Sequence, residues 1–322
     1  MAAPLPPAPG EREMRPSQAV WLIPTMESVR WAFGSGAWQP SRPEWLQAAR
    51  CVQAEEKERI SGFMFANDAK AAMGGRLLIR KLIAEKLKIP WDEIQLQRTE
   101  KGKPFLVNST PNVFPNFNFN ISHHGDYTVL AAEPVLQVGI DVMKTDLPGS
   151  SSIPEFFRIM NRQFTDHEWN MIKMAGDEWD QLNMFYRYWA LKESFIKAIG
   201  VGVTFNLQRI EYHVSPLQLR EGQVFRETRM FLDEEEEDAW SFEETMLDGR
   251  HHVAVALGKQ DTDSKDTLQV QVNAREKLPQ FTILNFQDLM FSAVPMAPED
   301  PNAWENFHAK QEKPIRQSNA PT

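Results

Sequence analysis

The sequence predicts an α/β protein of the α+β type, in which antiparallel strands pack against long helices. Apolar and polar residues alternate over residues 116–121, the pattern of a strand with one buried face. Turn residues at 125–126 and 133–134 then return the chain twice, which predicts an antiparallel meander. Apolar residues at helical spacing over 77–85 and 184–199 predict two long helices. The length of 322 residues allows one large or two modest domains.

In the first half of the chain, we expect residues 1–16 to be a disordered leader and the fold to begin with the apolar run 20–23. A long helix should open at Asn67 or Asp68. Gly74 and Gly75 lie inside this helix, where each costs about 1 kcal/mol relative to alanine. Their presence predicts that another part of the chain approaches the helix backbone closely.

The meander should consist of three strands, over residues 116–121, 127–132 and 135–143. Phe119 and Ile121 would face the core, and the asparagines between them would face outward. The first strand ends in Ser122, His123 and His124, directly before the turn. The polar side chains of these three residues should therefore lie at one end of the sheet.

The second half of the chain begins with helices. Pro154 suits a first helical turn, the segment 165–168 forms a capping box, and Gly200 suits the end of the second long helix. Strands are expected over 205–214, 223–231 and 251–257, joined by an exposed acidic loop at 233–248. Residues 258–278 should form a loose loop, and the proline-rich segment 293–322 a disordered tail.

Charge and composition exclude several classes of protein. The net charge is −9, and the nine carboxylates of residues 233–248 account for all of it, so the remainder is neutral. A strongly basic nucleic-acid-binding protein is disfavoured. No apolar stretch suits a membrane span. Cys51 is the single cysteine and there is no Cys/His set at zinc-ligand spacing, which favours a reducing compartment, with the cytosol as the expected location.

Two segments carry carboxylates that could perform chemistry. Asp141 ends an apolar strand, where a carboxylate is out of place unless it pairs with a cation or a metal; the alternative is an exposed residue at the strand end. Glu193 and Lys197 share one helical face at i and i+4. They could be an ordinary surface pair, or Glu193 could complete a magnesium site with Lys197 facing the phosphates that the metal binds.

A third group consists of cations. Arg98, Lys101 and Lys103 surround a glycine turn, Arg59 lies upstream, and His123 lies at the strand end. Each alone is more often a solvated side chain or a structural histidine. Together they suit a multiply charged phosphate ligand. Neither G-x-x-x-x-G-K-[ST] nor G-x-G-x-x-G is present.

In this order, the segments resemble those of the Sfp-type 4′-phosphopantetheinyl transferases. Any one motif is weak, but four in the same order are specific. The resemblance covers about residues 20–257 and continues through 281–292. The motifs that carry it are Lys101-Gly102-Lys103-Pro104, Phe119-Asn120-Ile121-Ser122-His123, Val138-Gly139-Ile140-Asp141 and the segment from Trp189 to Lys197.

The resemblance implies a monomer of two similar halves, residues 17–134 and 135–292, each an antiparallel sheet packed with a long helix. Coenzyme A would bind in the cleft between them. Arg59 and Arg98 would hold the 3′-phosphate, and His123 would contact the pyrophosphate. The residues implied to contact coenzyme A or the metal are Arg59, Arg98, Thr99, Glu100, Lys101, Gly102, Lys103, Asn120, Ile121, Ser122, His123, Asp141, Glu193, Ser194, Phe195, Ile196 and Lys197.

The implied reaction transfers the 4′-phosphopantetheine arm of coenzyme A to a serine of an acyl carrier protein domain, releasing adenosine 3′,5′-bisphosphate. Glu193, Lys197 and His123 would be the catalytic residues, with Glu193 as the candidate for accepting the serine proton, directly or through a metal-bound water. Asp141 and Glu193 would bind Mg²⁺. The family resemblance also implies broad carrier use, including fatty acid synthase and aminoadipate reductase-type carriers.

This sequence departs from the family pattern at three positions. Met143 stands where bacterial members commonly carry a second acid, so we expect Asp141 and Glu193 to be the only protein ligands of the metal, with water in the remaining place. Ser194 stands where many members have alanine, and His124 follows the matched histidine. Both are expected to be neutral.

Two other functions remain open at this point. The chain could be a non-catalytic module that binds coenzyme A or a carrier protein, although binding alone does not need the metal pair. It could also be a magnesium-dependent pyrophosphatase, in which water replaces the serine. The acidic run 233–248 is not expected to dock carriers, because carrier proteins are usually acidic and like charges repel.

Overall fold

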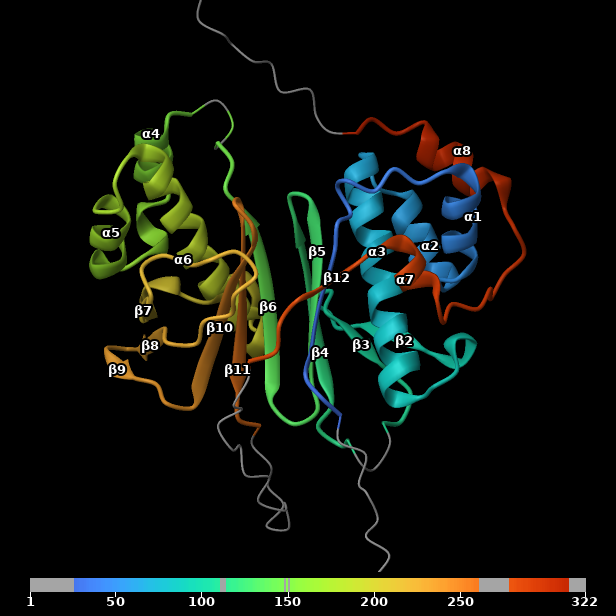
Figure 1. Cartoon of the computed structure of the whole chain (residues 1–322), viewed down its shortest axis with the longest axis horizontal. Helices are drawn as coiled ribbons and strands as arrows, with labels where there is room; N and C mark the ends of the chain where they lie inside the picture. Colours follow the sequence, from blue (N-terminus) through green and yellow to red (C-terminus); the bar gives the residue numbers. More distant parts are fainter. Residues whose placement is uncertain (1–25, 111–113, 148, 150, 261–277, 313–322) are drawn as a thin grey trace, which may run out of the picture.

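The structure is a computed structural model that describes residues 26–110, 114–147, 149, 151–260 and 278–312. The expected leader, the apolar run at 20–23, most of the loop at 258–278 and the end of the expected tail lie outside the described residues. In Figure 1 two groups of helices flank two central sheets. Among the described helices, none combines the length and the apolar character that crossing a membrane requires.

The N-terminal half contains one four-stranded sheet in the order β12-β1-β5-β4, with helices on one face. Helix α3 begins at Ala66, close to the predicted start, and a Cβ at Gly74 would lie 2.6 Å from Cδ1 of Phe33. The close approach predicted for this helix is therefore confirmed. The elements are β1 (Val29–Phe33), α1 (Arg42–Arg50), α2 (Ala54–Ser61), α3 (Ala66–Leu82), β2 (Leu96–Arg98), β3 (Pro104–Leu106), β4 (Asn118–His124) and β5 (Tyr127–Glu133).

The C-terminal half contains the sheet β10-β11-β6 and a smaller sheet β7-β8-β9. The capping box at 165–168 and the left-handed Gly200, with φ of 71°, confirm the predicted helix ends. The elements are β6 (Gln137–Lys144), α4 (Ile153–Ile159), η3 (Asn161–Gln163), α5 (Asp166–Lys173), α6 (Glu178–Ile199), η5 (Leu207–Arg209), β7 (Ile210–His213), β8 (Arg229–Leu232), β9 (Glu235–Glu236), β10 (Trp240–Asp248) and β11 (His251–Gly258).

The predicted meander is right for its first two strands and wrong for the third. β4 and β5 pair antiparallel, but β1 occupies the other edge of β5. β6 therefore cannot pair with β5, and it joins β11 in the second sheet. The turn after Glu133 thus carries the chain from one half to the other.

The prediction of an exposed acidic loop over 233–248 is also wrong for the second part of this segment, which forms strand β10. Glu243 and Glu244 are each about 2% exposed, although their sequence is acidic. Arg30 and Arg226 pair with Glu243, and Arg187 pairs with Glu244. Cations from elsewhere in the chain neutralise these carboxylates, so the local sequence did not reveal the strand.

The described residues from 278 onward belong to the N-terminal half, although the predicted bounds assigned 278–292 to the C-terminal half. The described part of the expected disordered tail is folded. β12 (Thr282–Leu284) pairs parallel with β1, so the first sheet is mixed rather than wholly antiparallel. The helices α7 (Phe286–Met290) and α8 (Pro301–His308) pack on the N-terminal half. Phe307 stacks on Trp45, with ring centroids 3.8 Å apart. Aromatic burial outweighs the polar, proline-rich composition on which the prediction rested.

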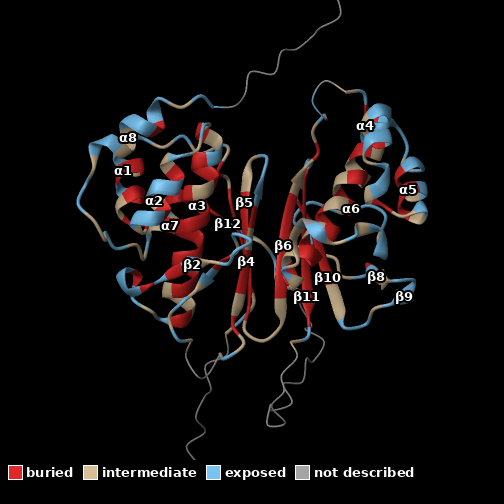
Figure 2. Ribbon diagram, turned by 180° about the vertical axis from the view of Figure 1, so that it is seen from behind, coloured by how far each residue is buried: buried red, intermediate tan, exposed pale blue. Residues whose placement is uncertain are grey.

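The two sheets meet along a seam between β4 and β6. The amide nitrogens of Val138 and Ile140 donate to Oδ1 of Asn118 and Oδ1 of Asn120, each over 2.9 Å. The constant offset along both strands means that they run parallel. The asparagines predicted to face outward are therefore the groups that satisfy the edge of the second sheet. Behind the seam, small and β-branched residues of both sheets form a separate core, which appears as the central buried strands in Figure 2.

Candidate active site

A cleft of about 890 Å³ lies between the two halves. One wall comes from the β2–β3 turn and the end of β4, and the other from α6 and the segments around η3 and η5. Of the residues predicted to form the site, twelve line this cleft: Arg98, Thr99, Glu100, Lys101, Gly102, Lys103, Asn120, Ile121, His123, Glu193, Ile196 and Lys197.

Asp141 lies on β6, at the inner side of the cleft, and is 4% exposed. Its Oδ1 accepts hydrogen bonds from Oγ of Ser122 over 2.8 Å and from Nζ of Lys197 over 2.5 Å. Its Oδ2 is buried without a hydrogen-bond partner in the described part of the chain. A buried carboxylate oxygen in this state favours a cation.

Strand β6 approaches α6 very closely at Gly139. A Cβ at this position would lie 2.0 Å from the carbonyl oxygen of Ser194. Only glycine allows this contact, which brings Asp141 beside the last turns of α6. The glycine in the motif 138–141 thus determines the position of the carboxylate that follows it.

Glu193 and Lys197 lie on one face of α6, as predicted, and both line the cleft. Burial, followed by the negative charge of Asp141, raises the pKa of the Glu193 carboxyl, while Lys197 acts in the opposite direction. Lys197 also donates to Oγ of Ser122 over 2.7 Å. The structure therefore brings two carboxylates and one ammonium group from two elements, β6 and α6, together.

The cations of the β2–β3 turn reach across the cleft. Nζ of Lys101 donates to the carbonyl oxygen of Val201 over 2.7 Å, and Nζ of Lys103 donates to that of Lys197 over 3.3 Å. Both ammonium groups thus lie at the carbonyl end of α6, where the helix dipole is negative. Burial lowers the pKa of Lys103. The turn is placed where an anion entering the cleft would meet its cations.

Arg59 does not line the main cleft. It lies at a smaller adjoining pocket of about 80 Å³, together with Arg98 and His123. Burial, followed by the charge of Arg59, lowers the pKa of the Arg98 guanidinium. Clustered guanidinium groups with few carboxylate partners favour a phosphate ligand.

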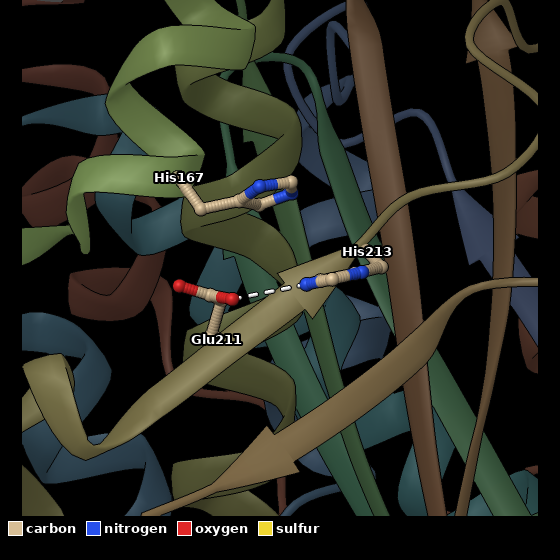
Figure 3. Close-up of side chains that lie close together, drawn as sticks. All are labelled: His167, Glu211 and His213. Atoms are coloured by element: carbon tan, nitrogen blue, oxygen red, sulfur yellow. Dashed lines mark hydrogen bonds and ion pairs between the residues drawn. The ribbon is translucent and has the colours of Figure 1, made fainter. Parts of the chain in front are cut away.

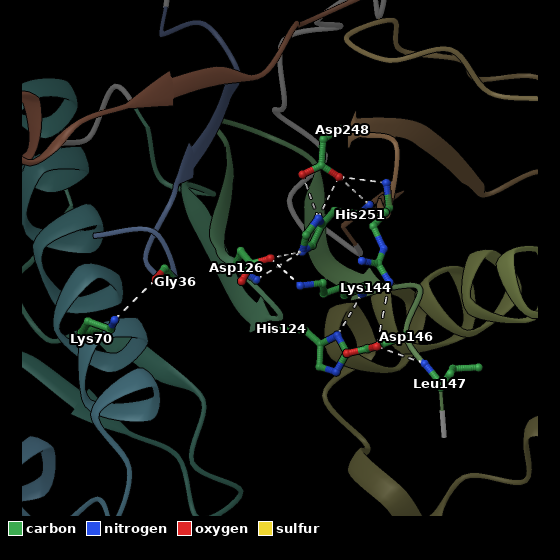
Figure 4. Close-up of polar contacts among 10 residues, drawn as sticks. Gly36, Lys70, His124, Asp126, Lys144, Asp146, Leu147, Asp248 and His251 are labelled. Carbon is green, nitrogen blue, oxygen red and sulfur yellow. Dashed lines mark hydrogen bonds and ion pairs between the residues drawn. The ribbon is translucent and has the colours of Figure 1, made fainter. Parts of the chain in front are cut away.

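His123 and His124 end β4, where a polar network holds the following turn (Figure 4). The amide nitrogen of Asp126 donates to Nε2 of His251, and Nζ of Lys144 contacts the carboxylate of Asp126 over 2.6 Å. The amide nitrogen of Lys144 donates to Nδ1 of His124 over 2.9 Å. These contacts tie the end of β4 to β6 and β11, so His123 is fixed relative to the opposite half.

His123 itself faces the cleft. Burial by the cleft walls, followed by the charge of Lys197, lowers its pKa. The free imidazole is therefore neutral at pH 7, and an anion in the cleft would favour its protonated form.

Three of the predicted contact residues are buried away from the cleft surface. Ser122 is 6% exposed and acts through its hydroxyl on Asp141 and Lys197. Ser194 donates to the carbonyl oxygen of Leu191, and Phe195 packs in the core of the C-terminal half. Their side chains hold α6 in place rather than face a ligand.

Sequence reasoning missed several residues of the cleft wall. Arg76 is the most notable, because it adds a cation to both pockets. Burial lowers its pKa to about 10, and it pairs with Glu56 over 3.4 Å. An arginine on the buried side of a long helix was the available signal. The other missed residues are Arg162, Gln163, Trp189, Phe205, Asn206 and Leu207.

The carboxylate pair fits a divalent cation that prefers oxygen ligands. The buried Oδ2 of Asp141 has no hydrogen-bond partner in the described part of the chain, and after burial the charge of Asp141 contributes to the raised pKa of the Glu193 carboxyl. In the described part of the chain, no third His, Cys, Asp or Glu joins these two in one ligand group. Met143, at the position of the missing acid, packs against the core of the C-terminal half instead.

Two family models match the chain, one for each half. The model "4′-phosphopantetheinyl transferase, N-terminal" matches residues 36–135, and the model "4′-phosphopantetheinyl transferase superfamily" matches residues 137–256. The chain belongs to the 4′-phosphopantetheinyl transferase superfamily, of the Sfp type. It is an enzyme that activates carrier proteins by phosphopantetheinyl transfer, which excludes the non-catalytic binding module.

Individual relatives agree with this family. The L-aminoadipate-semialdehyde dehydrogenase-phosphopantetheinyl transferase of Homo sapiens is 62% identical over 301 residues, which is 94% of this chain and 97% of the relative. The protein of the same name from Xenopus laevis is 62% identical over 91% of this chain and 95% of its own length. The 4′-phosphopantetheinyl transferase Sfp of Bacillus subtilis is 30% identical over 48% of this chain and 63% of its own length.

Proposed function

We propose that the cleft binds coenzyme A and that Asp141, Glu193, Lys197 and His123 carry out the transfer. The observation that supports this most directly is the buried Oδ2 of Asp141, which has no hydrogen-bond partner in the described part of the chain and lies beside a cleft rich in cations. A binding module would gain nothing from a buried carboxylate in this state.

Asp141 and Glu193 would hold the magnesium ion, and the reaction would depend on it. When bound, the ion supplies positive charge that neutralises the pyrophosphate of coenzyme A. Water would complete the coordination, because Met143 offers no carboxylate. Lys197 now donates to Oδ1 of Asp141, so its ammonium group already lies beside the proposed ligand.

The cations of the N-terminal half would bind the remaining phosphates. Arg59 and Arg98 line the smaller pocket and would hold the 3′-phosphate. The turn from Arg98 to Lys103 would surround the adenosine end, with Lys103 releasing its contact at the end of α6 to meet the anion.

In the transfer step, the hydroxyl oxygen of the carrier serine attacks the pantetheine-side phosphorus. Glu193 accepts the serine proton. Lys197 and His123 donate to the oxygens on which negative charge develops. The bond from that phosphorus to the bridging oxygen breaks, and adenosine 3′,5′-bisphosphate leaves.

The carriers proposed for this enzyme are acyl carrier protein domains of the fatty acid synthase and aminoadipate reductase types. We also propose that it acts as a monomer in the cytosol. The pairing of both halves within one chain supports the monomer, because each wall of the cleft comes from the same molecule.

The experiment is intact mass spectrometry of an apo acyl carrier protein after incubation with this enzyme, coenzyme A and Mg²⁺. The wild-type enzyme should add one phosphopantetheine arm, and omission of Mg²⁺ should prevent it. Glu193→Gln should lower the transfer rate by about 100- to 10,000-fold, the usual contribution of a general base. Its affinity for coenzyme A, measured by calorimetry, should change far less.

The matched control is Glu178→Gln, at the exposed start of the same helix. It should transfer at the wild-type rate. If Glu193→Gln transfers as fast as this control, the proposed base is wrong. Product released without a carrier would instead indicate hydrolysis of coenzyme A.

A further inference from the structure

A second cluster of potential metal ligands lies outside the cleft, on the outer side of the C-terminal half (Figure 3). His167 is in the first turn of α5, and Glu211 and His213 are alternate residues of β7. Alternate residues of a strand share one face, so both side chains of β7 point toward the start of α5. None of the three lines the cleft.

The three side chains converge. One ligand atom from each lies within 4.8 Å of the other two. Nε2 of His213 is 2.9 Å from Oε1 of Glu211, and the rings of His167 and His213 stack with centroids 4.2 Å apart. For one ion to contact all three ligands, the stacked imidazole rings would tilt so that a nitrogen of each points at one shared position.

The two elements that carry these ligands are held together by a buried carboxylate. Glu168, next to His167, is fully buried and accepts from the amide nitrogen of Tyr212 over 3.0 Å. It also forms an ion pair with Lys192 of α6 over 2.8 Å. The start of α5 and the middle of β7 are therefore fixed relative to one another before any ligand binds.

The orientation of the ligands is also set by neighbours. Oγ1 of Thr165 donates to Oε2 of Glu211 over 2.7 Å, which leaves Oε1 directed at His213. The ring of Phe231 lies beside His213, with centroids 4.4 Å apart. Outer contacts of this kind hold metal ligands in position in known metal sites.

We propose that His167, Glu211 and His213 form a binding site for a zinc-like divalent cation, distinct from the carboxylate pair of the cleft. Two imidazoles and one carboxylate are a typical zinc ligand set, whereas Mg²⁺ prefers oxygen ligands alone. The fourth position would be open to water. Binding would replace the direct contact between Nε2 of His213 and Oε1 of Glu211.

The position of the site suggests what the bound cation does. Gln163 and Leu207 line the cleft, and the chain runs from each of them within a few residues into α5 and β7. A cation that joins α5 to β7 therefore clamps two segments of the cleft wall from behind.

Calorimetric titration of the full-length enzyme with Zn²⁺, in the presence of excess Mg²⁺, tests the site. Wild type should bind one zinc ion that His167→Phe and Glu211→Gln bind at least about 100-fold more weakly, because loss of an outer contact alone costs up to that factor. His167→Phe keeps a ring against His213, and Glu211→Gln keeps the acceptor for Thr165, so both should fold normally.

The matched control is His308→Phe, which alters a histidine of α8 outside the cluster and should bind zinc like wild type. In hydrogen–deuterium exchange, Zn²⁺ should slow exchange in α5 and β7 of wild type but not of Glu211→Gln. Equal zinc affinity in wild type and both cluster variants would overturn the proposal. So would weakening by His308→Phe to the same degree.

Discussion

The carboxylates of the sheet region and of the cleft differ in how their oxygens are used. Both oxygens of Glu243 accept from arginines, Oε2 from Arg30 over 2.8 Å and Oε1 from Arg226 over 2.9 Å. At Asp141, two donors crowd onto Oδ1 while Oδ2 has no hydrogen-bond partner in the described part of the chain. Both groups are buried, so burial alone does not separate them. Both oxygens of Glu243 are paired within the chain, whereas Asp141 keeps one oxygen for the proposed cation.

The difference predicts that changes in the two regions affect different properties. Changes around Glu243 should alter the free energy of unfolding, because its pair with Arg30 links β10 to β1 and so joins the two halves. Changes at Asp141 should alter catalysis, because its free oxygen contributes little to the folded state without a cation.

The largest expected effect is that of Glu243→Ala. It leaves Arg30 and Arg226 without their shared partner, and breaking one side of a buried ion pair costs about 3–5 kcal/mol in the free energy of unfolding. Urea unfolding followed by tryptophan fluorescence measures this. The control is Glu236→Ala, which removes an exposed pair with Arg229 and should be close to wild type. Equal stability of both variants would contradict the structural role of the buried pair.

Asp141→Asn should have the next largest effect, on activity. The amide oxygen can still accept from Ser122 and Lys197, so the melting temperature should change little. The negative charge for the cation is lost, and the transfer rate should fall about 100- to 1,000-fold, as when one preorganised electrostatic group is removed. Transfer to an apo carrier at saturating Mg²⁺ is the measurement. A strong fall in melting temperature with normal activity would show that Asp141 stabilises the fold and does not act in catalysis.

His252 is a buried group that, like Asp141, has one atom without a hydrogen-bond partner in the described part of the chain, but it lies outside the candidate site. It lies on β11, is 4% exposed, and its Nδ1 has no partner in the described part of the chain, yet it lines neither pocket of the candidate site. Its Nε2 is 2.6 Å from Oδ1 of Asn183. Burial, followed by the charge of Arg187, lowers its pKa to about 3. A neutral imidazole tolerates an unpaired nitrogen better than a carboxylate does, so charge as well as pairing decides which groups need a ligand.

The lowered pKa of His252 gives a pH dependence of defined sign. In the unfolded chain, the imidazole of His252 binds a proton below about pH 6.5. In the folded chain, this imidazole stays neutral down to about pH 3. Acidification therefore favours unfolding, and His252 should account for about 2 kcal/mol of stability lost between about pH 7.5 and pH 5. His252→Gln should lose correspondingly less over the same interval. Parallel stability curves for the two proteins would show that the folded histidine is not held neutral.

The proposed catalytic residues could be selected from the sequence because their motifs are local. The glycine before Asp141 and the spacing of Glu193 and Lys197 are features of single elements, and the structure brings these elements together. The pairing of Arg30 with Glu243 could not be predicted, because 213 residues separate them and neither belongs to a periodic pattern. β10 was missed for the same reason, since its acidic sequence is neutralised by distant arginines.

The asparagines of β4 show a second limit of prediction from the sequence. Their alternation with apolar residues correctly predicted strand β4, in which Phe119 is buried and Ile121 is half-buried at the cleft. Periodicity distinguishes the two faces of a strand but does not say what the polar face meets. Here it meets the edge of another sheet, a neighbour set by the crossing of the chain after Glu133.

The smallest expected effect separates the two asparagines of the seam. Asn118 and Asn120 accept from β6 over the same distance of 2.9 Å, and Asn120→Ala should lose about 1 kcal/mol of stability, the usual value of one hydrogen bond. Asn118 also donates to the carbonyl oxygens of Asn116 and Leu136, so Asn118→Ala should lose more. Of the two asparagines, only Asn120 lines the cleft. Its hydrogen-bond partner on β6, Ile140, directly precedes Asp141. Asn120→Ala should therefore also raise the KM for coenzyme A or lower kcat, while Asn118→Ala keeps both. Steady-state kinetics on the two variants at matched stability makes the comparison. Identical kinetics would mean that the seam stabilises the fold without aligning His123 with Asp141.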